Sequence, residues 1–227
     1  MIARRIAGVL LHPTSLPGPY GIGDFGDELL TFLDWVQSAG LGLWQILPLN
    51  PPGYGNSPYG CHSSYAGNPL LVSPARLQRN GLLPANALDD MPSFSEEHVE
   101  FDRVAEFKNR LLRRSWQHFN ERARTRYQND FRRFEEDNAW LEDWATYASL
   151  KERYGGTAWT GWPHEIAVRD AAALAAAKRE LAAEISYHKY VQFLFFRQWA
   201  EIRRAADARD IEIMGDVPIY VAGDSAD

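Results

Sequence analysis

Residues 5–49 read RIAGVLLHPTSLPGPYGIGDFGDELLTFLDWVQSAGLGLWQILPL, and the order of the elements they predict indicates the fold class. Two short apolar runs, residues 6–11 and 41–49, flank a segment with apolar residues at helical spacing. Asp27 and Gly40 stand where that helix should begin and end. Neither run alternates apolar with polar residues, which is typical of strands buried in a parallel sheet. The stretch therefore predicts a parallel β-α-β unit and an α/β fold.

The second apolar run leads into a loop, residues 50–69 (NPPGYGNSPYGCHSSYAGNP), without any Val, Ile, Leu, Met or Phe. Four Pro, four Gly, three Tyr and the only cysteine of the chain lie in it. Such a segment cannot form a hydrophobic core. Loops that follow the carboxyl ends of parallel strands carry the functional residues of α/β folds. We expect this loop to form one wall of a binding site.

The composition excludes several classes of protein. The chain has 227 residues, 45% hydrophobic and 24% charged, with a net charge of −6. The acidic balance argues against nucleic acid or an anionic membrane as the main partner. One cysteine cannot form an internal disulfide, so nothing indicates an oxidising compartment. The apolar run near the N-terminus is shorter than the roughly 7–15 residues of a secretory leader or the roughly 20 of a membrane helix. A cytoplasmic protein is predicted.

The middle of the chain is predicted to be helical. Residues 96–204 are almost entirely helix-favouring, and Gly155 and Gly156 end one of the helices. The Ala-rich part that follows is too long for one element, so two helices should meet near residues 182–186. Mixed charges surround the basic, aromatic run that starts at Lys108, so we interpret that run as a solvated helix face and not as an RNA-binding surface.

A third apolar run, residues 211–221, predicts another strand, with Asp216 just beyond its core and Pro218 preventing ordinary central-strand pairing. Three parallel strands do not close a sheet. A complete eight-stranded barrel needs roughly 200 to more than 400 residues, and much of this chain is spent on helices. We therefore predict the N-terminal part of a larger barrel protein, or a truncated form of one, whose open apolar edge favours aggregation or partial disorder.

Four blocks follow one another between Gly8 and Asp227: LLHPTSLPGPYGIGDFG, WQILPLNPPGYGNSPYGCHSSYAGNPLLVS, WLEDWATYASLKERYGG with W..WP after it, and IMGDVPIYVAGDSAD. Together they resemble the amylomaltase-type 4-α-glucanotransferases, the bacterial and plant disproportionating enzymes. The resemblance implies a (β/α)8 TIM barrel of the α-amylase superfamily, of which this chain holds the first three strands. It assigns residues 1–75 to the start of the barrel, 76–183 to a helical insertion between strands 2 and 3, and 184–227 to the return to the barrel.

The resemblance also implies an activity. These enzymes transfer a segment of a 1,4-α-D-glucan to a new 4-position on an acceptor glucan or glucose, with retention and without a cofactor or metal. Their substrates are maltooligosaccharides, starch and glycogen-derived dextrins. The carboxylate nucleophile and the acid/base of such chemistry, about 5–5.5 Å apart, lie on later strands in this family. We expect no catalytic residue in this chain and no turnover by it alone. A non-catalytic glucan-binding module and a related α-glucan hydrolase are the alternatives.

Two residues are the main candidates for substrate binding. Tyr59 matches a family tyrosine that lines the sugar subsite next to the scissile bond, and a phenol offers both an apolar face and a hydroxyl. Asp216 matches an acidic residue at the end of a barrel strand, where it would hydrogen-bond sugar hydroxyls or position neighbouring groups. The alternatives are a tyrosine packed on the barrel mouth and a carboxylate that caps a turn.

The same loop holds further candidates. Tyr54 aligns with a tyrosine that some family members use in a second glucan-binding groove, although an exposed loop aromatic explains it equally well. Ser57 would bond sugar hydroxyls or satisfy the turn. Cys61 and His62 do not form a metal site, because such a site needs three or four ligands and the sequence offers no matching partners. They do not form a Cys/His nucleophile pair either, because adjacent side chains of an extended segment point to opposite sides. The GxGxxG pattern of residues 21–26 does not directly follow a strand, as a dinucleotide site requires.

Overall fold

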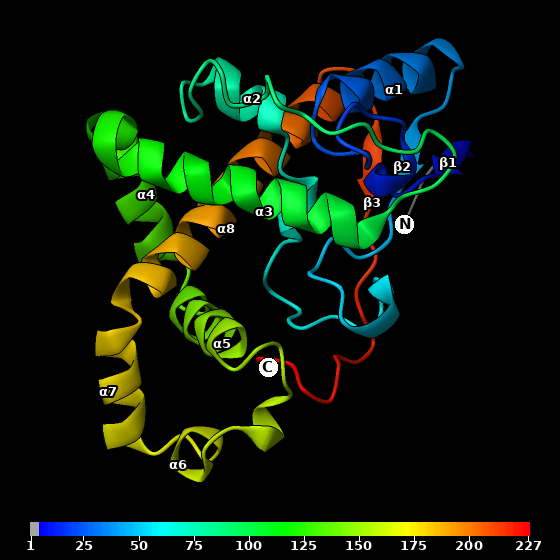
Figure 1. Cartoon of the computed structure of the whole chain (residues 1–227). Coiled ribbons are helices and arrows are strands. Elements are labelled where there is room, and N and C mark those ends of the chain that lie inside the picture. Colours follow the sequence, from blue (N-terminus) through cyan, green and yellow to red (C-terminus); the bar gives the residue numbers. More distant parts are fainter. Residues whose placement is uncertain (1–4) are drawn as a thin grey trace.

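The computed structural model describes residues 5–227, in which three strands form one parallel sheet in the order β1-β2-β3 (Figure 1). The strands are β1 (Gly8–Leu10), β2 (Leu43–Gln45) and β3 (Glu212–Met214). Their centres are in register: Val9 pairs with Trp44, and Trp44 with Ile213. The predicted parallel β-α-β unit is thus confirmed, and the third apolar run joins the same sheet. Each strand is shorter than the apolar run that predicted it.

The helices fall into two groups, one connecting β1 to β2 and a larger one between β2 and β3. The short helices η1 and η2 lie in loops that follow β1 and β2. The bounds are η1 (Pro13–Ser15), α1 (Asp27–Ser38), η2 (Tyr54–Asn56), η3 (Pro69–Leu71), α2 (Pro74–Arg79), α3 (Phe101–His118), η4 (Phe119–Ala123), α4 (Arg124–Asp137), α5 (Leu141–Arg153), η5 (Trp159–Gly161), α6 (His164–Ala167), α7 (Ala171–Glu180) and α8 (Ala182–Asp207). Within residues 5–227, no helix is both long and apolar enough to cross a bilayer.

The boundaries of α1 correct one sequence prediction and confirm another. Asp27 is not the cap: Gly26 occupies that position, and Asp27 is the first helical residue, bonded through its carboxylate to Arg79 Nη2 at 2.7 Å. Gly40, just past the helix, has a φ of +71°, a left-handed conformation that favours glycine and ends the helix as expected.

The Ala-rich segment forms two helices, as predicted, with Leu181 at the junction between α7 and α8. The break lies one residue before the predicted range. Helix α8 then runs back toward the sheet, so that the chain leaves β2, passes through α2 to α7 and returns to β3 (Figure 1).

Aromatic side chains fill the space between α8 and the sheet. Trp44, the central residue of β2, is completely buried and lies edge-on to Trp199 of α8, with ring centroids 6.3 Å apart. Phe25, also fully buried, contacts Phe195 and Trp199 at centroid distances of 5.2 and 5.4 Å. Because aromatic side chains bury the largest areas, this cluster fixes α8 on the strand that precedes the Tyr-rich loop.

A buried ion pair fastens α3 to the loops around the sheet. Lys108 Nζ donates to Asp24 Oδ2 at 2.6 Å and to the carbonyl oxygens of Leu70 and Val72 at 2.7 and 3.2 Å. The side chains of Lys108 and Asp24 are only 1% and 3% exposed. All three protons of the ammonium group can be used in this way, which a buried charge requires.

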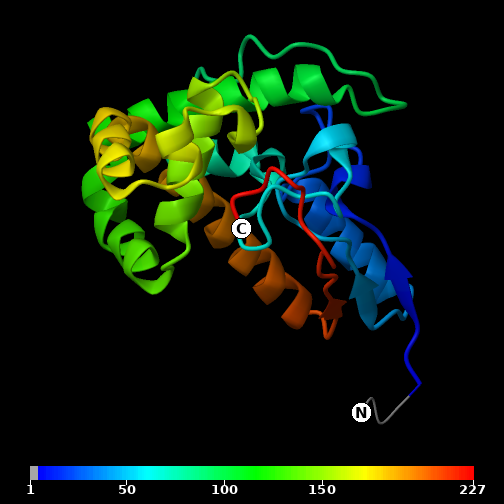
Figure 2. The ribbon, with the colours of Figure 1, turned by 90° about the horizontal axis from the view of Figure 1, so that it is seen from below.

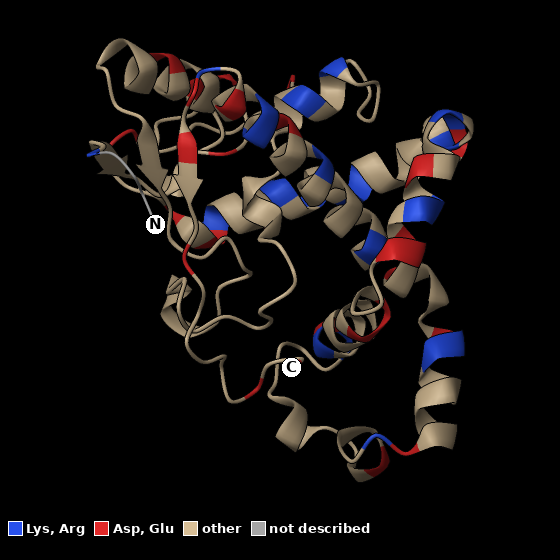
Figure 3. Cartoon of the chain, turned by 180° about the vertical axis from the view of Figure 1, so that it is seen from behind, with Lys and Arg blue, Asp and Glu red and all other residues tan. Residues whose placement is uncertain are grey.

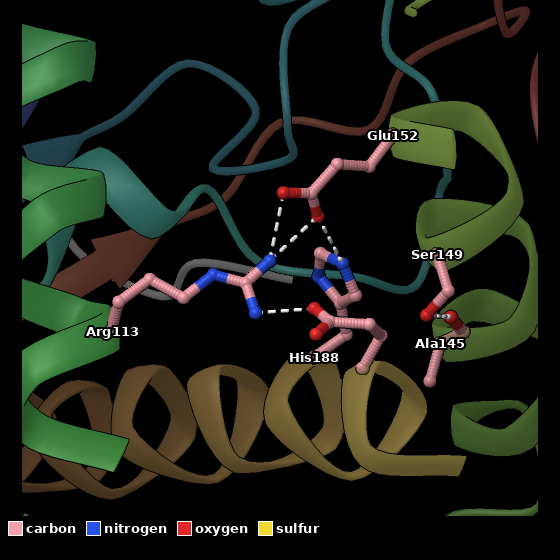
Figure 4. Close-up of polar contacts among 6 residues, drawn as sticks. Arg113, Ala145, Ser149, Glu152 and His188 are labelled. Atoms are coloured by element: carbon pink, nitrogen blue, oxygen red, sulfur yellow. Dashed lines mark hydrogen bonds and ion pairs between the residues drawn. The ribbon is translucent and has the colours of Figure 1, made fainter. Parts of the chain in front are cut away.

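A charged network connects α3, α5 and α8 (Figure 4). Arg113 of α3 donates to both carboxylate oxygens of Glu152 at 2.8 Å and also binds Glu184. His188 Nε2 lies 3.2 Å from Glu152 Oε2, and this hydrogen bond, with Arg113, lowers the pKa of Glu152 to about 2.

Charges of both signs are interspersed along the helices (Figure 3). Within α4, for example, Arg132 and Glu136 form an i, i+4 pair at 3.9 Å. The interpretation of the basic run as a solvated mixed-charge face is therefore correct only in part: Arg132 has an acidic partner on its own helix, whereas Lys108, which begins the run, is 1% exposed and pairs with Asp24.

Candidate functional site

The carboxyl ends of the three strands open on one edge of the sheet, because the strands are parallel. The loop after β2 and the segment after β3 leave this edge and lie side by side, and the C-terminus lies close to the loop (Figures 1 and 2). Residues separated by more than 150 positions in the sequence thus face each other here, as the hydrogen bond between residues 59 and 216 shows.

The loop after β2 begins as a small hairpin. His62 N donates to Pro51 O at 2.9 Å, Gly53 N donates to Gly60 O at 2.7 Å, and Pro52 pairs with Cys61 in an antiparallel bridge. Residues 54–59 form its tip, where Gly55 and Asn56 have φ values of +73° and +56°. The loop is ordered by its own backbone hydrogen bonds, as its prolines and glycines indicated.

Tyr59 and Asp216 are brought together at this edge. The Tyr59 hydroxyl donates to Asp216 Oδ2 at 2.6 Å, and the Val217 amide donates to Asp216 Oδ1 at 2.9 Å. The Tyr59 side chain is 38% exposed, and its hydrogen bond to the carboxylate raises the pKa of the phenol. Together they offer an aromatic face and a carboxylate, groups suited to a sugar ring and its hydroxyls. Sugar binding by either residue stays a prediction.

The two weaker candidates of the loop have different surroundings. Tyr54 is fully exposed on η2 at the hairpin tip. Ser57 Oγ accepts a long hydrogen bond from the Tyr59 amide, 3.4 Å, so its hydroxyl helps to close the turn that carries Tyr59. Ser57 therefore makes the turn contact that was the alternative to a sugar contact.

His12 is a candidate that the sequence analysis did not single out. It follows β1, and its ring contacts Thr14 Oγ1 at 2.7 Å and Pro48 O at 3.3 Å. Burial lowers the pKa of His12, so the ring is held neutral. It lines a cavity of about 130 Å³ together with Asn56, Pro58 and Phe101. Its position two residues beyond a parallel strand was the available signal.

The segment after β3 is fastened to the hairpin and to α5. Ala222 N donates to Cys61 O at 2.9 Å, and Ala226 N donates to His62 O at 2.8 Å. Asp224 accepts a hydrogen bond from Lys151 Nζ at 2.5 Å, and this contact lowers the pKa of Asp224. The backbone bonds join the second and fourth sequence blocks, and the Lys151–Asp224 contact joins the third and fourth, which the sequence alone could not connect.

Helix α8 holds the outgoing end of the same loop. Gln192 exchanges two hydrogen bonds with the backbone of Gly67, at 2.7 and 3.0 Å, and Gln198 does the same with Ser73, at 2.7 and 3.2 Å. A Cβ atom on Gly67 would lie 2.2 Å from the Phe195 ring. Only glycine allows α8 to approach the loop this closely.

Cys61 and His62 have the contacts of structural residues. Cys61 is completely buried, which raises the pKa of its thiol. The His62 ring lies beside α5, with Nδ1 3.4 Å from the Tyr147 hydroxyl and 3.8 Å from Asp224 Oδ1. Burial, and then the nearby Lys151, lowers the pKa of His62.

Two larger cavities lie elsewhere in residues 5–227. One of about 360 Å³ is lined by α5 and the aromatic residues Trp159 and Trp162, with the last residues of the chain at its side. The other, about 880 Å³, lies between residues 14–22 and 91–99. None of the four predicted binding residues lines either cavity. The GxGxxG pattern borders the second, in a loop well separated from β1 and therefore not in the position of a dinucleotide site.

The family model and the relatives that match this chain carry the same description. The sequence model of a family described as 4-alpha-glucanotransferase, glycoside hydrolase family 77, matches residues 11–227. The 4-alpha-glucanotransferase of Synechocystis is 42% identical over the whole chain, and that of Thermus thermophilus is 43% identical over 98% of it. The chain spans only 45% and 44% of the lengths of these two relatives.

Solved structures extend the likeness to the fold. The amylomaltase of Streptococcus agalactiae, solved in complex with acarbose, has a TM-score of 0.88 and 35% identity, and it matches 98% of this chain and 45% of its own. The amylomaltase of Corynebacterium glutamicum, at 18% identity and a TM-score of 0.70, shares the fold and matches 98% of this chain and 31% of its own.

Proposed function

The chain belongs to the 4-alpha-glucanotransferase family, glycoside hydrolase family 77, and on this premise we propose that the protein transfers glucan segments. The donor is a 1,4-α-D-glucan, and the acceptor is the 4-position of another glucan or of glucose. The observation that carries the proposal is the match of the whole of residues 11–227 to this family. The meeting of Tyr59 and Asp216 at the carboxyl edge of the sheet supports it from the structure.

The sheet of this chain is, in this proposal, the first part of a (β/α)8 barrel. Residues 1–75 contribute the first two strands, residues 76–183 a helical insertion, and residues 184–227 the return through α8 to β3. The parallel order β1-β2-β3 and the 44–45% coverage of the relatives support this assignment. Tests of activity accordingly use the complete gene product, meaning the protein encoded by the whole reading frame that contains these residues.

The proposed chemistry assigns a binding role to this chain. A retaining transfer needs a carboxylate nucleophile and a carboxylic acid about 5–5.5 Å apart, and we place both on barrel strands outside residues 1–227. Tyr59 would present its ring to a pyranose, while Asp216, already in a hydrogen bond to the Tyr59 hydroxyl, would accept hydrogen bonds from sugar hydroxyls. Tyr54, exposed at the hairpin tip, would contact glucan in a second groove away from the catalytic centre.

The substrates we propose are α-1,4-glucans, including maltooligosaccharides and dextrins from starch or glycogen. The complex of the Streptococcus agalactiae amylomaltase with acarbose, an oligosaccharide, supports this class of ligand. A location in the cytoplasm stays a prediction from the sequence, and the rice relative carries the description chloroplastic/amyloplastic.

Incubation of the complete gene product with maltotriose tests the function directly. A transferase yields glucose together with longer dextrins, while the number of reducing ends stays constant. A hydrolase yields a rising number of reducing ends, because water is then the acceptor. Retention of maltotriose without any product identifies a binding module. Either of the last two results would overturn the proposed activity.

A further inference from the structure

Two side chains of α5 extend from the helical segment to the segment that follows β3. Lys151 Nζ donates to Asp224 Oδ2 at 2.5 Å, and the Tyr147 hydroxyl donates to the Asp224 carbonyl oxygen at 2.5 Å. The Lys151 side chain is 15% exposed and that of Asp224 28% exposed, so the pair is partly shielded from water. The proposed function leaves this contact without a role.

Asp224 is connected to the hairpin through the backbone. Its neighbours Ala222 and Ala226 donate to the carbonyl oxygens of Cys61 and His62, at 2.9 and 2.8 Å. The end of the segment adds further bonds, because the Asp227 carboxylate accepts from the Ser63 hydroxyl and from the amide and hydroxyl of Ser64. A shift of Asp224 would therefore move the hairpin strand at Cys61 and His62, which directly follows the tip that carries Tyr59.

The stretch between Asp216 and Ala222 has little support of its own. Val217, Ile219 and Tyr220 are 73%, 92% and 71% exposed. Among the described residues 5–227, hydrogen bonds hold the segment at two points: at Asp216, which follows β3 and binds Tyr59, and at residues 222–227, which bind the hairpin and α5. Releasing the second anchor would leave the pair of Tyr59 and Asp216 without support on one side.

From these contacts we propose that Lys151 is a positioning residue for glucan transfer, which holds the Asp224 segment against the hairpin and thereby fixes Tyr59 and Asp216. The inference rests on the proposed function, and it gives the helical segment a role in substrate binding. Lys151 acts through other residues and touches no substrate. Because misplacement by about 1 Å can reduce a rate about a hundredfold, one ion pair at this point is sufficient to matter.

Variants of the complete gene product test the proposal, with maltotriose disproportionation as the assay. Lys151→Met should lower kcat/KM about tenfold or more, mainly through a higher KM, because Tyr59 is a binding residue. Lys151→Arg keeps the charge and should restore most of the activity. The matched control is Lys178→Met, which removes a lysine of α7 paired with Glu142 at 3.1 Å, and it should leave both kinetic constants unchanged.

A double-mutant cycle separates positioning from general stability. Tyr59→Phe removes the hydroxyl that binds Asp216. If Lys151 acts through this pair, Lys151→Met combined with Tyr59→Phe should be much less harmful than the product of the two single effects. Fully multiplicative effects, or a Lys151→Met enzyme with wild-type constants, would overturn the proposal.

Hydrogen exchange gives a readout that does not depend on catalysis. In Lys151→Met, amide exchange should rise both in residues 222–227 and in the hairpin, residues 51–62, and stay unchanged in the Lys178→Met control. A rise confined to residues 222–227 would show that Asp224 does not support the hairpin, and would overturn the proposal. If the wild-type protein transfers no glucan but the exchange pattern is as expected, the proposed function fails while the structural coupling holds.

Discussion

Replacing Lys108 with methionine tests how the helices are held to the loops around the sheet. Methionine has nearly the same length and volume, so the substitution removes the charge and three hydrogen bonds with little change in packing. These bonds join α3 to Asp24 in the loop after β1 and to the carbonyls of Leu70 and Val72 at the end of the Tyr-rich loop.

The expected loss is large because the partner stays buried. With the lysine gone, the Asp24 carboxylate, whose side chain is 3% exposed, would lack its counter-charge. Breaking a buried ion pair on one side costs about 3–5 kcal/mol, whereas an exposed pair contributes about 0–1 kcal/mol. With an unfolding entropy of about 2.1 cal/mol/K per residue, the complete gene product, roughly twice the length of this chain, should lose about 1 °C per kcal/mol, so its melting temperature should fall by about 3–5 °C.

Urea-induced unfolding of the complete gene product, followed by tryptophan fluorescence, measures the effect. Lys178→Met, which breaks a surface pair with Glu142, serves as the control and should change the free energy of unfolding by less than about 1 kcal/mol. The double variant Lys108→Met/Asp24→Leu should recover part of the loss, because no buried charge then remains unpaired. A loss below about 1 kcal/mol in the single variant would show that the buried ion pair does not hold α3 to these loops.

Two further predictions concern Glu152 of α5 and the close approach of α8 to Gly67. The pKa of Glu152 is lowered to about 2 by the His188 hydrogen bond and by Arg113, so its contribution to stability is fully present above pH 4.5 and is lost as the pH falls toward 2. Glu152→Gln should lower the free energy of unfolding by about 1 kcal/mol at pH 7, a small value because the side chain is 56% exposed. The difference from wild type should vanish near pH 2. Equal urea midpoints of the two proteins at pH 7 would contradict this. Gly67→Ala should destabilise the protein by about 1–3 kcal/mol because its Cβ would overlap the Phe195 ring, whereas Gly60→Ala, with open space around its Cβ, should have little effect. Similar melting temperatures for these two glycine variants would show that α8 can move away from residue 67 without loss of stability.

The architecture of the sheet was predictable because local pattern determines it. Short apolar runs without alternation, separated by one helical segment, can form little else than a parallel unit. The lengths of the strands were not predictable in the same way. The third run was predicted over residues 211–221, yet pairing stops at Met214, before Pro218, whose missing N–H cannot join a ladder. Asp27 was predicted as a cap, but the preceding glycine occupies that position.

The candidate site was predictable by residue type and by position after a strand, but not by contact. Tyr59 and Asp216 each follow a parallel strand, and that placement brings them to the same edge. Their hydrogen bond depends on how the hairpin folds. The pairing of Lys151 with Asp224 depends on the path of the whole helical segment between β2 and β3, which no local pattern encodes. His12 also follows a parallel strand, but it was missed because a single histidine in a Pro-rich loop forms no motif with a second residue.

We propose that the edge formed by Tyr59 and Asp216 binds glucan. Calorimetric titration of acarbose into the complete gene product and its Tyr59→Ala variant tests this most directly. Trp35→Ala removes another exposed aromatic, on α1, and serves as the control. Tyr59→Ala should weaken binding at least tenfold, about 1.4 kcal/mol, while Trp35→Ala leaves the affinity unchanged. An unaltered affinity in Tyr59→Ala would contradict the claim.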